Sequence, residues 1–262
     1  MLLQDYNTVV TGAARGLGAA AARRFVAEGA RTVVSDMDEA GALECARSID
    51  PTGRRAIGVR CDVSSHEDCA RLVATAEEFF GAPIDVFLAH AGVGFVGRLT
   101  EVEVERIRRA IEVNVLGSVF SAQAALHSLT KSPRASLLFT SSLQGVMGRP
   151  LRSVYTASKH AIVGLVKGLA LEFGPQGVRV NAIAPAATDT PHLRAMLAAT
   201  TADVDEAVRN VAASMPLGWL PTPEDFADAA VFLASPAARS ITGHTLLLDS
   251  GAAAGIFKRE PA

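Results

Sequence analysis

The sequence predicts a single α/β domain in which a parallel sheet of about seven strands is covered by helices on both faces. Short runs rich in β-branched and other apolar residues alternate with longer, alanine-rich segments of helical periodicity. The short runs have little polar alternation, which is typical of strands buried on both faces. No linker, repeat or low-complexity stretch divides the 262 residues, so we predict one doubly wound domain over residues 1–262.

The elements follow in order along the chain. The strands are expected in the apolar runs, at Thr8–Thr11, Thr32–Ser35, Ala56–Arg60, Val86–Ala89, Ser136–Thr140, Arg179–Ala184 and Leu246–Leu248. The helices are expected between them, at Gly16–Glu28, Glu39–Ile49, His66–Phe80, Glu101–Leu129, Val154–Phe173 and Pro223–Ala234. Three helical segments are followed by glycines where helices commonly end, at Gly29, Gly81 and Gly174. Residues 186–220 lack clear periodicity, and because a connection of this length is usually functional, we expect a substrate-binding lid there.

The net charge, the cysteines and the apolar segments of the sequence limit which partners and which cellular compartment can be expected. A formal net charge of −2 gives no electrostatic case for nucleic acid or an anionic membrane. Cys45, Cys61 and Cys69 are odd in number and form no C-x-x-C pair, which favours a reducing compartment over a disulfide framework or a metal site. The sequence contains neither a recognisable signal peptide nor an apolar run long enough to cross a membrane. We therefore expect a cytoplasmic protein without a catalytic metal, acting on a small molecule.

The first strand ends in a glycine-rich turn, Thr11-Gly12-Ala-Ala-Arg15-Gly16-Leu-Gly18, and a helix follows at once. Glycines at such a turn let the backbone approach a pyrophosphate and let the helix pack closely on the strand. The phosphate would meet free N–H groups at the positive end of the helix. The spacing G-x-x-x-G-x-G differs from the commoner G-x-G-x-x-G, but strand, turn and helix together predict a dinucleotide site in a Rossmann-type sheet.

Asp36 closes the second strand and favours NAD over NADP. A carboxylate at this position accepts hydrogen bonds from the ribose hydroxyls and repels a 2′-phosphate. Arg15, in the glycine turn, could pair with a 2′-phosphate and would then favour NADP. Because no basic residue follows Asp36 to bind that phosphate, we expect Asp36 to decide for NAD. Asp62 and Val63 follow the third strand and are expected beside the adenine, although an acid at the start of a helix is the alternative for Asp62.

Ser142, Tyr155 and Lys159 are the candidate catalytic group. The tyrosine precedes the lysine by four residues, which puts both on one helical face, about 5–6 Å apart at Cβ. An ammonium held so close favours the phenolate and lowers the pKa of the tyrosine from about 10. The Ser142 hydroxyl could hydrogen-bond the same substrate oxygen. A long helix can carry a tyrosine and a lysine at this spacing by chance. The pair indicates a catalytic site only because a dinucleotide-binding signature precedes it in the chain.

With these motifs the chain resembles the short-chain dehydrogenase/reductase family, in its form of about 250 residues, from about Thr8 to Gly251. The family order is kept by the glycine turn, Asn114-Val-Leu-Gly117, Ser142, Tyr155-x-x-x-Lys159 and the series Asn181, Pro185 and Thr190. The resemblance implies that Tyr155 is the acid/base and that Ser142 positions the substrate oxygen. It also implies that Lys159 binds the nicotinamide ribose and lowers the pKa of Tyr155, and that Asn114 holds a water in a proton relay.

The resemblance extends to the remaining contacts of the site. It implies cofactor contacts at Gly12, Arg15, Gly16, Leu17, Gly18, Asp36, Met37, Asp62, Val63, Ala91, Gly92, Tyr155, Lys159, Pro185, Thr188 and Thr190. It implies substrate contacts at Ser142, Gln144 and Tyr155. Ser141 is the neighbouring alternative to Ser142, and the spacing to the tyrosine selects Ser142. Members of the family usually form homotetramers, here through the segments 101–129 and 154–173, with a dimer as the alternative.

Three departures from the family pattern stand out. The usual Asn-Asn-Ala-Gly after the fourth strand reads Ala89-His90-Ala91-Gly92, and His90 could replace one of the lost hydrogen bonds. The usual Pro-Gly after the sixth strand reads Pro185-Ala186. The expected Asp-Gly-Gly near the C-terminus reads Asp249-Ser250-Gly251.

The resulting hypothesis is an NAD-dependent dehydrogenase that interconverts a secondary alcohol and a ketone. The alternatives are a non-catalytic NAD-binding sensor or scaffold, an NADP-dependent ketoreductase, and an epimerase or enoyl reductase of the same fold. The lid segment is rich in apolar residues, namely Leu193, Met196, Leu197, Val208, Val211, Met215, Leu217 and Trp219. They favour an apolar, medium-sized substrate such as a steroid, a terpenoid or an acyl chain. The alternative is that these residues only pack the segment onto the domain.

Overall fold

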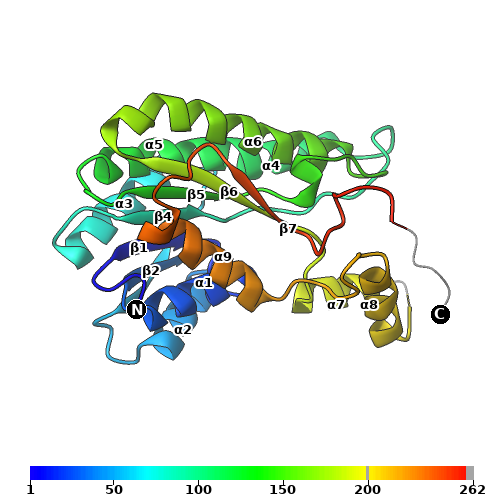
Figure 1. The fold of residues 1–262 in the computed structure, drawn as a ribbon, viewed down its shortest axis with the longest axis horizontal. Coiled ribbons are helices and arrows are strands. Elements are labelled where there is room, and N and C mark those ends of the chain that lie inside the picture. Colours follow the sequence, from blue (N-terminus) through cyan, green and yellow to red (C-terminus); the bar gives the residue numbers. More distant parts are fainter. Residues whose placement is uncertain (199–200, 258–262) are drawn as a thin grey trace.

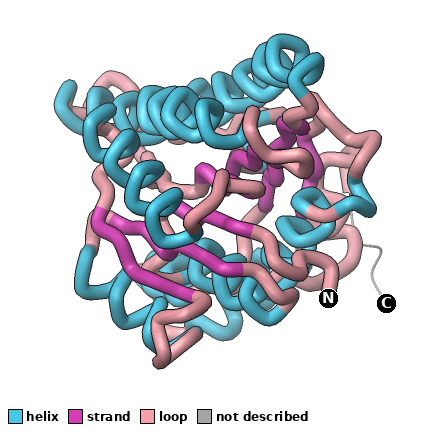
Figure 2. The backbone as a smooth tube through the Cα atoms, turned by 90° about the vertical axis from the view of Figure 1, so that its left-hand side faces the viewer, coloured by secondary structure: helices cyan, strands magenta, loops and turns pink. Residues whose placement is uncertain are grey.

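One parallel sheet of seven strands forms the centre of the molecule (Figures 1 and 2). The computed structural model describes residues 1–198 and 201–257, so two residues of the expected lid lie outside the described ones. The strands are β1 (Asn7–Thr11), β2 (Arg31–Asp36), β3 (Ala56–Arg60), β4 (Val86–Ala89), β5 (Ser136–Thr140), β6 (Arg179–Pro185) and β7 (Thr245–Leu248). The predicted fold class is confirmed, and each predicted strand is present with its ends shifted by at most one residue.

The strand order β3-β2-β1-β4-β5-β6-β7 reverses direction at β1. The chain builds β2 and β3 on one side of β1 and then returns to place β4 on the other side. In open parallel sheets, ligands bind beyond the carboxyl ends of the strands at such a reversal. The register aligns Thr11 with Ser35 and Val10 with Leu88, so β1, β2 and β4 end at nearly the same level. This edge therefore collects the glycine turn, the end of β2 and the segment after β4.

Helices cover both faces of the sheet (Figure 1). One face carries α1 (Gly16–Ala27), α2 (Glu39–Ile49) and α9 (Pro223–Ala234). The other carries α3 (His66–Phe80), α4 (Val104–Ile111), α5 (Gly117–Leu129) and α6 (Ser153–Phe173). No helix among the described residues has the length and apolarity that a membrane crossing requires.

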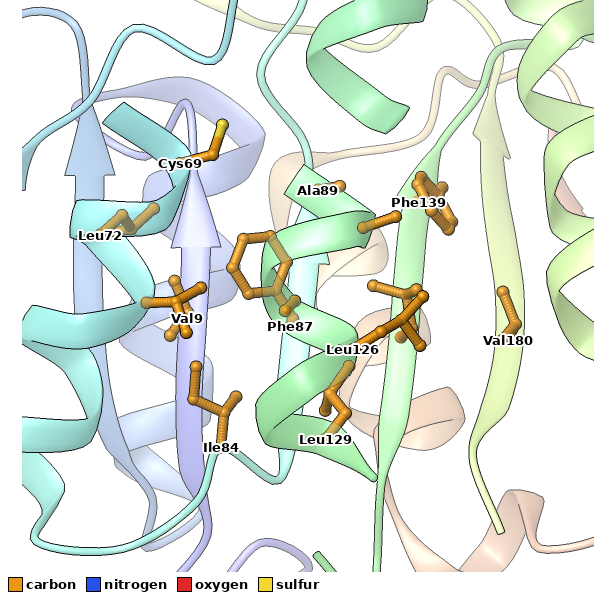
Figure 3. Packing of buried hydrophobic residues seen from close by; sticks show 14 of the residues in the cluster. Val9, Cys69, Leu72, Ile84, Phe87, Ala89, Leu126, Leu129, Phe139 and Val180 are labelled. Atoms are coloured by element: carbon orange, nitrogen blue, oxygen red, sulfur yellow. The ribbon is translucent and has the colours of Figure 1, made fainter. Parts of the chain in front are cut away.

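Successive strand residues alternate between two hydrophobic cores because a strand turns its side chains to opposite faces. Val9, Phe87 and Phe139 enter the core under α3, α5 and α6, and Figure 3 shows them with side chains of α3 and α5. Their neighbours Val10 and Leu88 enter the core under α1 and α9. The apolar runs of the sequence are thus explained by burial on both faces.

One predicted helix is interrupted, and one predicted helix end has an unexpected conformation. The segment expected as one helix from Glu101 begins at Val104 and is interrupted by a π-helical turn at Glu112–Leu116, which contains Asn114. Such turns insert one residue into an α-helix and often occur at functional sites. Gly174 is right-handed and leads into a 3₁₀ turn, which Gly177 ends with φ +80°.

The segment between β6 and α9 contains α7 (Pro191–Ala198) and α8 (Val204–Ala213). It has a small core of its own, in which Leu193 and Met215 are buried together with Leu220, and Leu197, Val208 and Val211 pack against them. Three of its apolar residues stay exposed, namely Met196 at 39%, Leu217 at 54% and Trp219 at 59%. Packing thus accounts for most of the apolar residues of the segment, but not for these three.

Candidate active site

The glycine turn after β1 is held against the segment after β4. Gly12 has φ +68°, and a Cβ atom on it would lie 2.7 Å from Cα of Ala91, so only glycine allows this approach. The Thr11 hydroxyl oxygen accepts hydrogen bonds from the backbone N–H groups of His90 (3.1 Å) and Ala91 (3.2 Å). These contacts fix two of the expected cofactor-binding segments side by side.

The turn leaves room for a phosphate at the start of α1. Gly16 has φ +62°, and no described atom lies within 4 Å of the place where its Cβ would stand. Arg15 precedes the helix, is exposed, and makes no capping hydrogen bond with its side chain to the described residues. The first N–H groups of α1, at Leu17 and Gly18, therefore face a helix end without a side-chain cap, as a pyrophosphate site requires.

Asp36 joins the end of β2 to the glycine turn. Its carboxylate accepts hydrogen bonds from the backbone N–H groups of Ala14 and Asp38, each at 3.1 Å. A carboxylate offers about four acceptor positions, so ribose hydroxyls can still bind to it. Met37 is exposed beside it. These residues fit the adenosine end of a dinucleotide.

Asp62, expected beside the adenine, lies in the turn before α3, ahead of the Ser65 that caps this helix. Its Oδ1 accepts hydrogen bonds from the backbone N–H (3.0 Å) and the hydroxyl (2.6 Å) of Ser64, and its Oδ2 lies 3.5 Å from the Arg109 guanidinium. The carboxylate thus shapes the turn before α3. Val63, which follows it, is buried.

Tyr155 and Lys159 lie one turn apart on α6. The Lys159 ammonium nitrogen is 5.7 Å from the centre of the Tyr155 ring and donates a hydrogen bond to the Thr140 carbonyl oxygen at 2.9 Å. The lysine is only 5% exposed, and burial lowers its pKa to about 8. At neutral pH the side chain therefore stays mostly protonated, a charge buried at the end of β5.

Ser142, and not Ser141, lies beside the phenol. The Ser142 side chain forms a hydrogen bond with Tyr155, and its oxygen also accepts one from the backbone N–H of Gln144 at 3.2 Å. The Ser141 hydroxyl instead donates to the backbone oxygen of Lys159 at 3.0 Å. Adjacent residues at the strand end thus have different partners.

The pKa of Tyr155 is shifted in the direction opposite to the one that the sequence argument expected. Burial raises the pKa of Tyr155, and its hydrogen bond with Ser142 and the charge of Arg152 act in the opposite direction. The Lys159 ammonium donates its hydrogen bond to the Thr140 carbonyl. The pKa of Tyr155 is thus raised on balance by burial, whereas the sequence argument expected it to be lowered.

Asn114 ties three segments together from the π-helical turn. Its Oδ1 accepts a hydrogen bond from the Val93 N–H (2.8 Å), and its Nδ2 donates to the Val93 carbonyl (3.0 Å) and the Ser158 hydroxyl (3.2 Å). A Cβ atom on Gly92 would lie 3.2 Å from Asn114 Oδ1 and 3.5 Å from Lys159 Nζ. Both side chains therefore meet Gly92, and the Asn114 amide is used to hold the site together.

His90 makes the kind of bond expected of a replacement for the family's asparagine. Its Nδ1 lies 3.0 Å from the Thr140 hydroxyl, which links the ends of β4 and β5, and its ring packs on Phe226. Burial, with a smaller contribution from the Lys159 charge, lowers the pKa of His90 to about 4. The ring is therefore neutral at physiological pH.

The end of β6 completes this edge. Pro185 is its last residue, and Ala186 in place of glycine donates its N–H to the Leu248 carbonyl at 2.9 Å. The Thr188 side chain is buried, and the Thr190 hydroxyl accepts from the backbone N–H of Leu193 at 3.2 Å, at the start of α7.

Two further polar groups bear on the substrate side. Gln144 Oε1 is buried and has no hydrogen-bond partner in the described part of the chain. The sequence reasoning missed Arg152, whose Nη1 donates to the Phe95 carbonyl (3.4 Å) and whose Nη2 lies 3.8 Å from Met196 Sδ. Its signal was available as a basic residue three positions before Tyr155. Across residues 1–198 and 201–257, no group of three or more His, Cys, Asp or Glu residues is placed to hold a metal ion.

Comparison with known proteins places this geometry in a family. A family described as "Enoyl-(Acyl carrier protein) reductase" matches residues 12–253. The cis-4-hydroxycyclohexanecarboxylate dehydrogenase of Sinomonas cyclohexanicum is 37% identical, over 93% of this chain and 94% of its own. The 3beta-hydroxysteroid dehydrogenase 1 of Eggerthella lenta is 38% identical, over 95% of this chain and 94% of its own.

Solved structures agree with the sequence relatives. The ligand-free aldohexose dehydrogenase of Thermoplasma acidophilum superposes with a TM-score of 0.89 at 28% identity, and the match covers 99% of this chain and 98% of that one. Family match, relatives and fold extend over nearly the whole chain and coincide with the glycine turn and the Tyr155–Lys159 pair. The chain belongs to the short-chain dehydrogenase/reductase family, a family of oxidoreductases.

Proposed function

We propose that this protein is an NAD-dependent dehydrogenase that interconverts a secondary alcohol and a ketone, with Tyr155 as the acid/base. One observation carries the proposal. The Tyr155 phenol, hydrogen-bonded to Ser142 and one helical turn from a buried Lys159, belongs to the same edge of the sheet as a glycine turn with space for a pyrophosphate.

Dehydrogenases of this family use a nicotinamide cofactor, and the chain has residues suited to hold one. The turn 12–18 would bind the pyrophosphate, Asp36 the adenosine ribose, and Lys159 with the segment 90–92 the nicotinamide end. When bound, the cofactor would supply the hydride chemistry, which no side chain can supply. Asp36 supports NAD over NADP because a 2′-phosphate would lie against a carboxylate.

The side chains of the site handle the proton. In the direction of oxidation, the alcohol hydroxyl donates its proton to the Tyr155 phenolate, and the Ser142 hydroxyl hydrogen-bonds the substrate oxygen. Lys159, charged at neutral pH because its pKa is about 8, stabilises the phenolate. Asn114 keeps Val93 and Ser158 in place around this group. General acid–base catalysis of this kind contributes about 10²–10⁴-fold to turnover.

A ring-bearing alcohol is the substrate class that we infer. Two relatives are named for hydroxyl groups on a cyclohexane carboxylate and a steroid, and the structural neighbour is named for an aldohexose. Exposed apolar side chains come from three segments that meet at Arg152, namely Val96, Leu151 and Met196. Such side chains suit the carbon skeleton of a ring, and Gln144 Oε1 offers an acceptor for a substrate donor.

We also propose that the protein forms a homotetramer or a dimer through the helices α5 and α6. Gly164 and Gly168 leave open space outside α6, and Leu171 is 82% exposed on the same helix. Such a surface permits close approach of a second helix. Sedimentation velocity of the full chain tests this assembly, and a monomer at micromolar concentration would contradict it.

The function is tested by following reduced nicotinamide absorbance with NAD⁺ or NADP⁺ and a panel of alcohols. The panel contains cis-4-hydroxycyclohexanecarboxylate, its neutral carboxamide, a 3β-hydroxysteroid and an aldohexose. We expect reduction of NAD⁺ with at least one ring alcohol, and a loss of about 10²–10⁴-fold in kcat for Tyr155→Phe with NAD⁺ affinity unchanged.

The alternatives give different outcomes in the same assay. A sensor or scaffold would bind NAD⁺ and oxidise none of the alcohols. An enoyl reductase, the activity for which the matching family is described, would consume reduced cofactor with an enoyl thioester and leave the alcohols unchanged. Either result would contradict the proposed dehydrogenase.

A further inference from the structure

Arg152 is a half-buried cation beside the proposed acid/base, and its side-chain hydrogen bonds are all with neutral groups, while the charge of Arg149 also acts on it. It precedes α6 and lies three residues before Tyr155, whose pKa its charge lowers. Its Nη1 donates to the Phe95 carbonyl at 3.4 Å, and its Nη2 lies 3.8 Å from the Met196 sulfur. Both contacts are long, and a guanidinium has five N–H donors, so most of its hydrogen-bonding capacity is unused.

The position of Arg152 is set by three segments that surround the substrate side of Tyr155. Phe95 belongs to the segment after β4, and the backbone of that segment is joined to the stretch before α6 by a hydrogen bond from Gly97 N–H to the Leu151 carbonyl at 2.9 Å. Met196 belongs to α7 in the lid segment. The guanidinium therefore bridges the lid to the body of the site.

Other cations near this region already have partners or stay exposed. Arg194 on α7 is paired with Asp189 at 2.7 Å and with Asp205 at 2.8 Å. Arg106 is exposed, faces the Phe95 ring and donates to the Val96 carbonyl. Arg152 has no ion pair with any carboxylate that the structure describes.

A half-buried guanidinium can be satisfied by backbone carbonyls, as at Arg179, which donates to the Leu233 and Ala234 carbonyls at 2.6 and 2.9 Å. Arg152 has no such set of short bonds, so its free donors can bind a ligand that supplies negative charge. The planar fork of arginine matches a carboxylate in a bidentate arrangement, and such charge-assisted bonds are about twice as strong as neutral ones. Arg152 directly precedes α6, and its charge acts on the Tyr155 phenol within the first turn of that helix. A carboxylate on Arg152 and a hydroxyl on Tyr155 would therefore belong to one molecule of the size of a substituted six-membered ring.

We propose that Arg152 binds a carboxylate of the substrate, so that the protein acts on hydroxy acids and keto acids in which the carboxylate is several bonds from the reacting carbon. This inference rests on the proposed function for the identity of the reacting group. The anion site itself is defined by Arg152, the Phe95 carbonyl and Met196, and binding can test it without turnover. Arg152 is then a specificity-determining residue, and the negative charge also fixes which end of the ring faces Tyr155.

The first test measures binding by calorimetry to the full protein saturated with NADH. The ligands are cyclohexanecarboxylate and cyclohexanecarboxamide, which have nearly the same shape and differ in charge. We expect the carboxylate to bind at least tenfold more tightly than the amide to the wild type, and Arg152→Gln to abolish this difference while leaving the amide affinity unchanged. Arg152→Lys keeps the charge without the fork, so we expect it to keep part of the preference.

Arg149→Gln is the matched control, because Arg149 is exposed, lies three residues away and also lacks a described carboxylate partner. It should leave the preference within about twofold of the wild type, since an exposed charge at this distance is screened. Equal affinity of the wild type for acid and amide, no binding of the acid, or equal losses in Arg149→Gln and Arg152→Gln would overturn the proposal.

The second test separates this inference from the proposed function. With cis-4-hydroxycyclohexanecarboxylate and its carboxamide, Arg152→Gln should lower kcat/KM for the acid by roughly ten- to hundredfold and change the amide by less than about threefold. If the wild type oxidises both equally well, the carboxylate site is wrong and the dehydrogenase stands. If no alcohol of the panel is oxidised while the acid binds through Arg152, the anion site stands and the dehydrogenase activity is wrong.

Discussion

Asp85 at the amino end of the sheet and Lys159 at its carboxyl end are buried charged residues with opposite surroundings. At the amino end, Asp85 accepts hydrogen bonds from the Asn7 N–H (2.8 Å) and the Ser132 hydroxyl (2.6 Å), and pairs with Arg134 at 3.1 Å. At the carboxyl end, Lys159 and Arg152 have only neutral partners among the described residues. The charge of Asp85 is thus paired within the fold, whereas Lys159 and Arg152 have no carboxylate partner among the described residues.

A buried charge without a paired carboxylate lowers the stability of the fold, and such groups commonly occur at functional sites. Burial lowers the pKa of Lys159 to about 8 and of His90 to about 4, so both sites disfavour the charged form. Asp85 is buried with three donors instead, and its charge is compensated. Substitutions should therefore affect activity at one end and stability at the other.

The largest effect is expected for Lys159→Met, which should lower turnover by about 10²–10⁴-fold. Its effect on stability follows from the pKa. The lysine has a pKa of 10.5 in the unfolded chain and of about 8 in the folded one. Below pH 8 the side chain is charged in both states, and its buried charge destabilises the fold. This destabilisation is lost as the pH rises from 8 to 10.5, because the folded protein then releases the proton first. The variant should therefore be as stable as the wild type at neutral pH, or more stable by up to about 3 kcal/mol.

Turnover assays and urea denaturation of the same preparation check this. Retained turnover together with a large loss of stability would show that Lys159 belongs with the compensated charges of the amino end. Lys159→Arg keeps the charge and serves as the comparison variant.

Asp85→Ala should produce the opposite result. Removing the carboxylate leaves Arg134 and two buried donors without their acceptor, which we expect to lower the free energy of unfolding by about 3–5 kcal/mol. The kcat of the folded variant should be unchanged. Asp228→Ala is the control, because its exposed pair with Arg24 should contribute less than about 1 kcal/mol. Denaturant midpoints that shift equally in both variants would contradict the comparison.

His90 should make the stability of the carboxyl end depend on acid pH. The unfolded ring binds its proton below pH 6.5 and the folded one only below about 4, so the unfolded state binds more protons between these values. The free energy of unfolding should therefore fall as pH drops from 6.5 to 4, by about 3 kcal/mol from this residue. His90→Asn keeps a hydrogen-bonding group and should lose this part of the dependence, which denaturation over the pH range measures. Parallel pH profiles for variant and wild type would contradict it.

The smallest effect concerns the choice of cofactor. Asp36→Ala should lower the preference for NAD⁺ over NADP⁺ in kcat/KM by about tenfold, because it removes both the ribose acceptor and the charge facing a 2′-phosphate. Glu39→Gln, an exposed acid at the start of α2, is the control and should leave the preference unchanged. An unaltered ratio in Asp36→Ala would place the basis of cofactor choice elsewhere, with Arg15 as the next residue to change.

The arrangement of strands could be predicted because burial on both faces leaves a plain signature. Apolar runs such as Val86–Ala89 have no polar face, so their length and spacing identify them. The helix interruption at Glu112–Leu116 has no such signature. A π-helical turn depends on what its side chains find in other segments, and Asn114 finds Val93 and Ser158 only after the sheet has formed.

The features of the candidate site also differ in whether they depend on local sequence or on contacts between distant segments. Local spacing brings Tyr155 and Lys159 to one helical face, and local glycines shape the turn after β1, so both could be predicted. The partner of the Lys159 ammonium could not, since Thr140 comes from a different strand. Arg152 could not be predicted as a site residue because an arginine before a helix is common. That it has no carboxylate partner among the described residues follows only from the packing of the folded chain.

The sequence by itself determined the strand and helix pattern, the glycine turn and the Tyr155–Lys159 pair, because each rests on periodicity or contacts within a few residues. Only the tertiary structure decided that the Lys159 ammonium meets the Thr140 carbonyl, that His90 is held neutral between β4 and β5, and that Arg152 is left without a carboxylate partner among the described residues. Burial and long-range partners determine the charge state of a side chain, and neither exists until distant segments pack together.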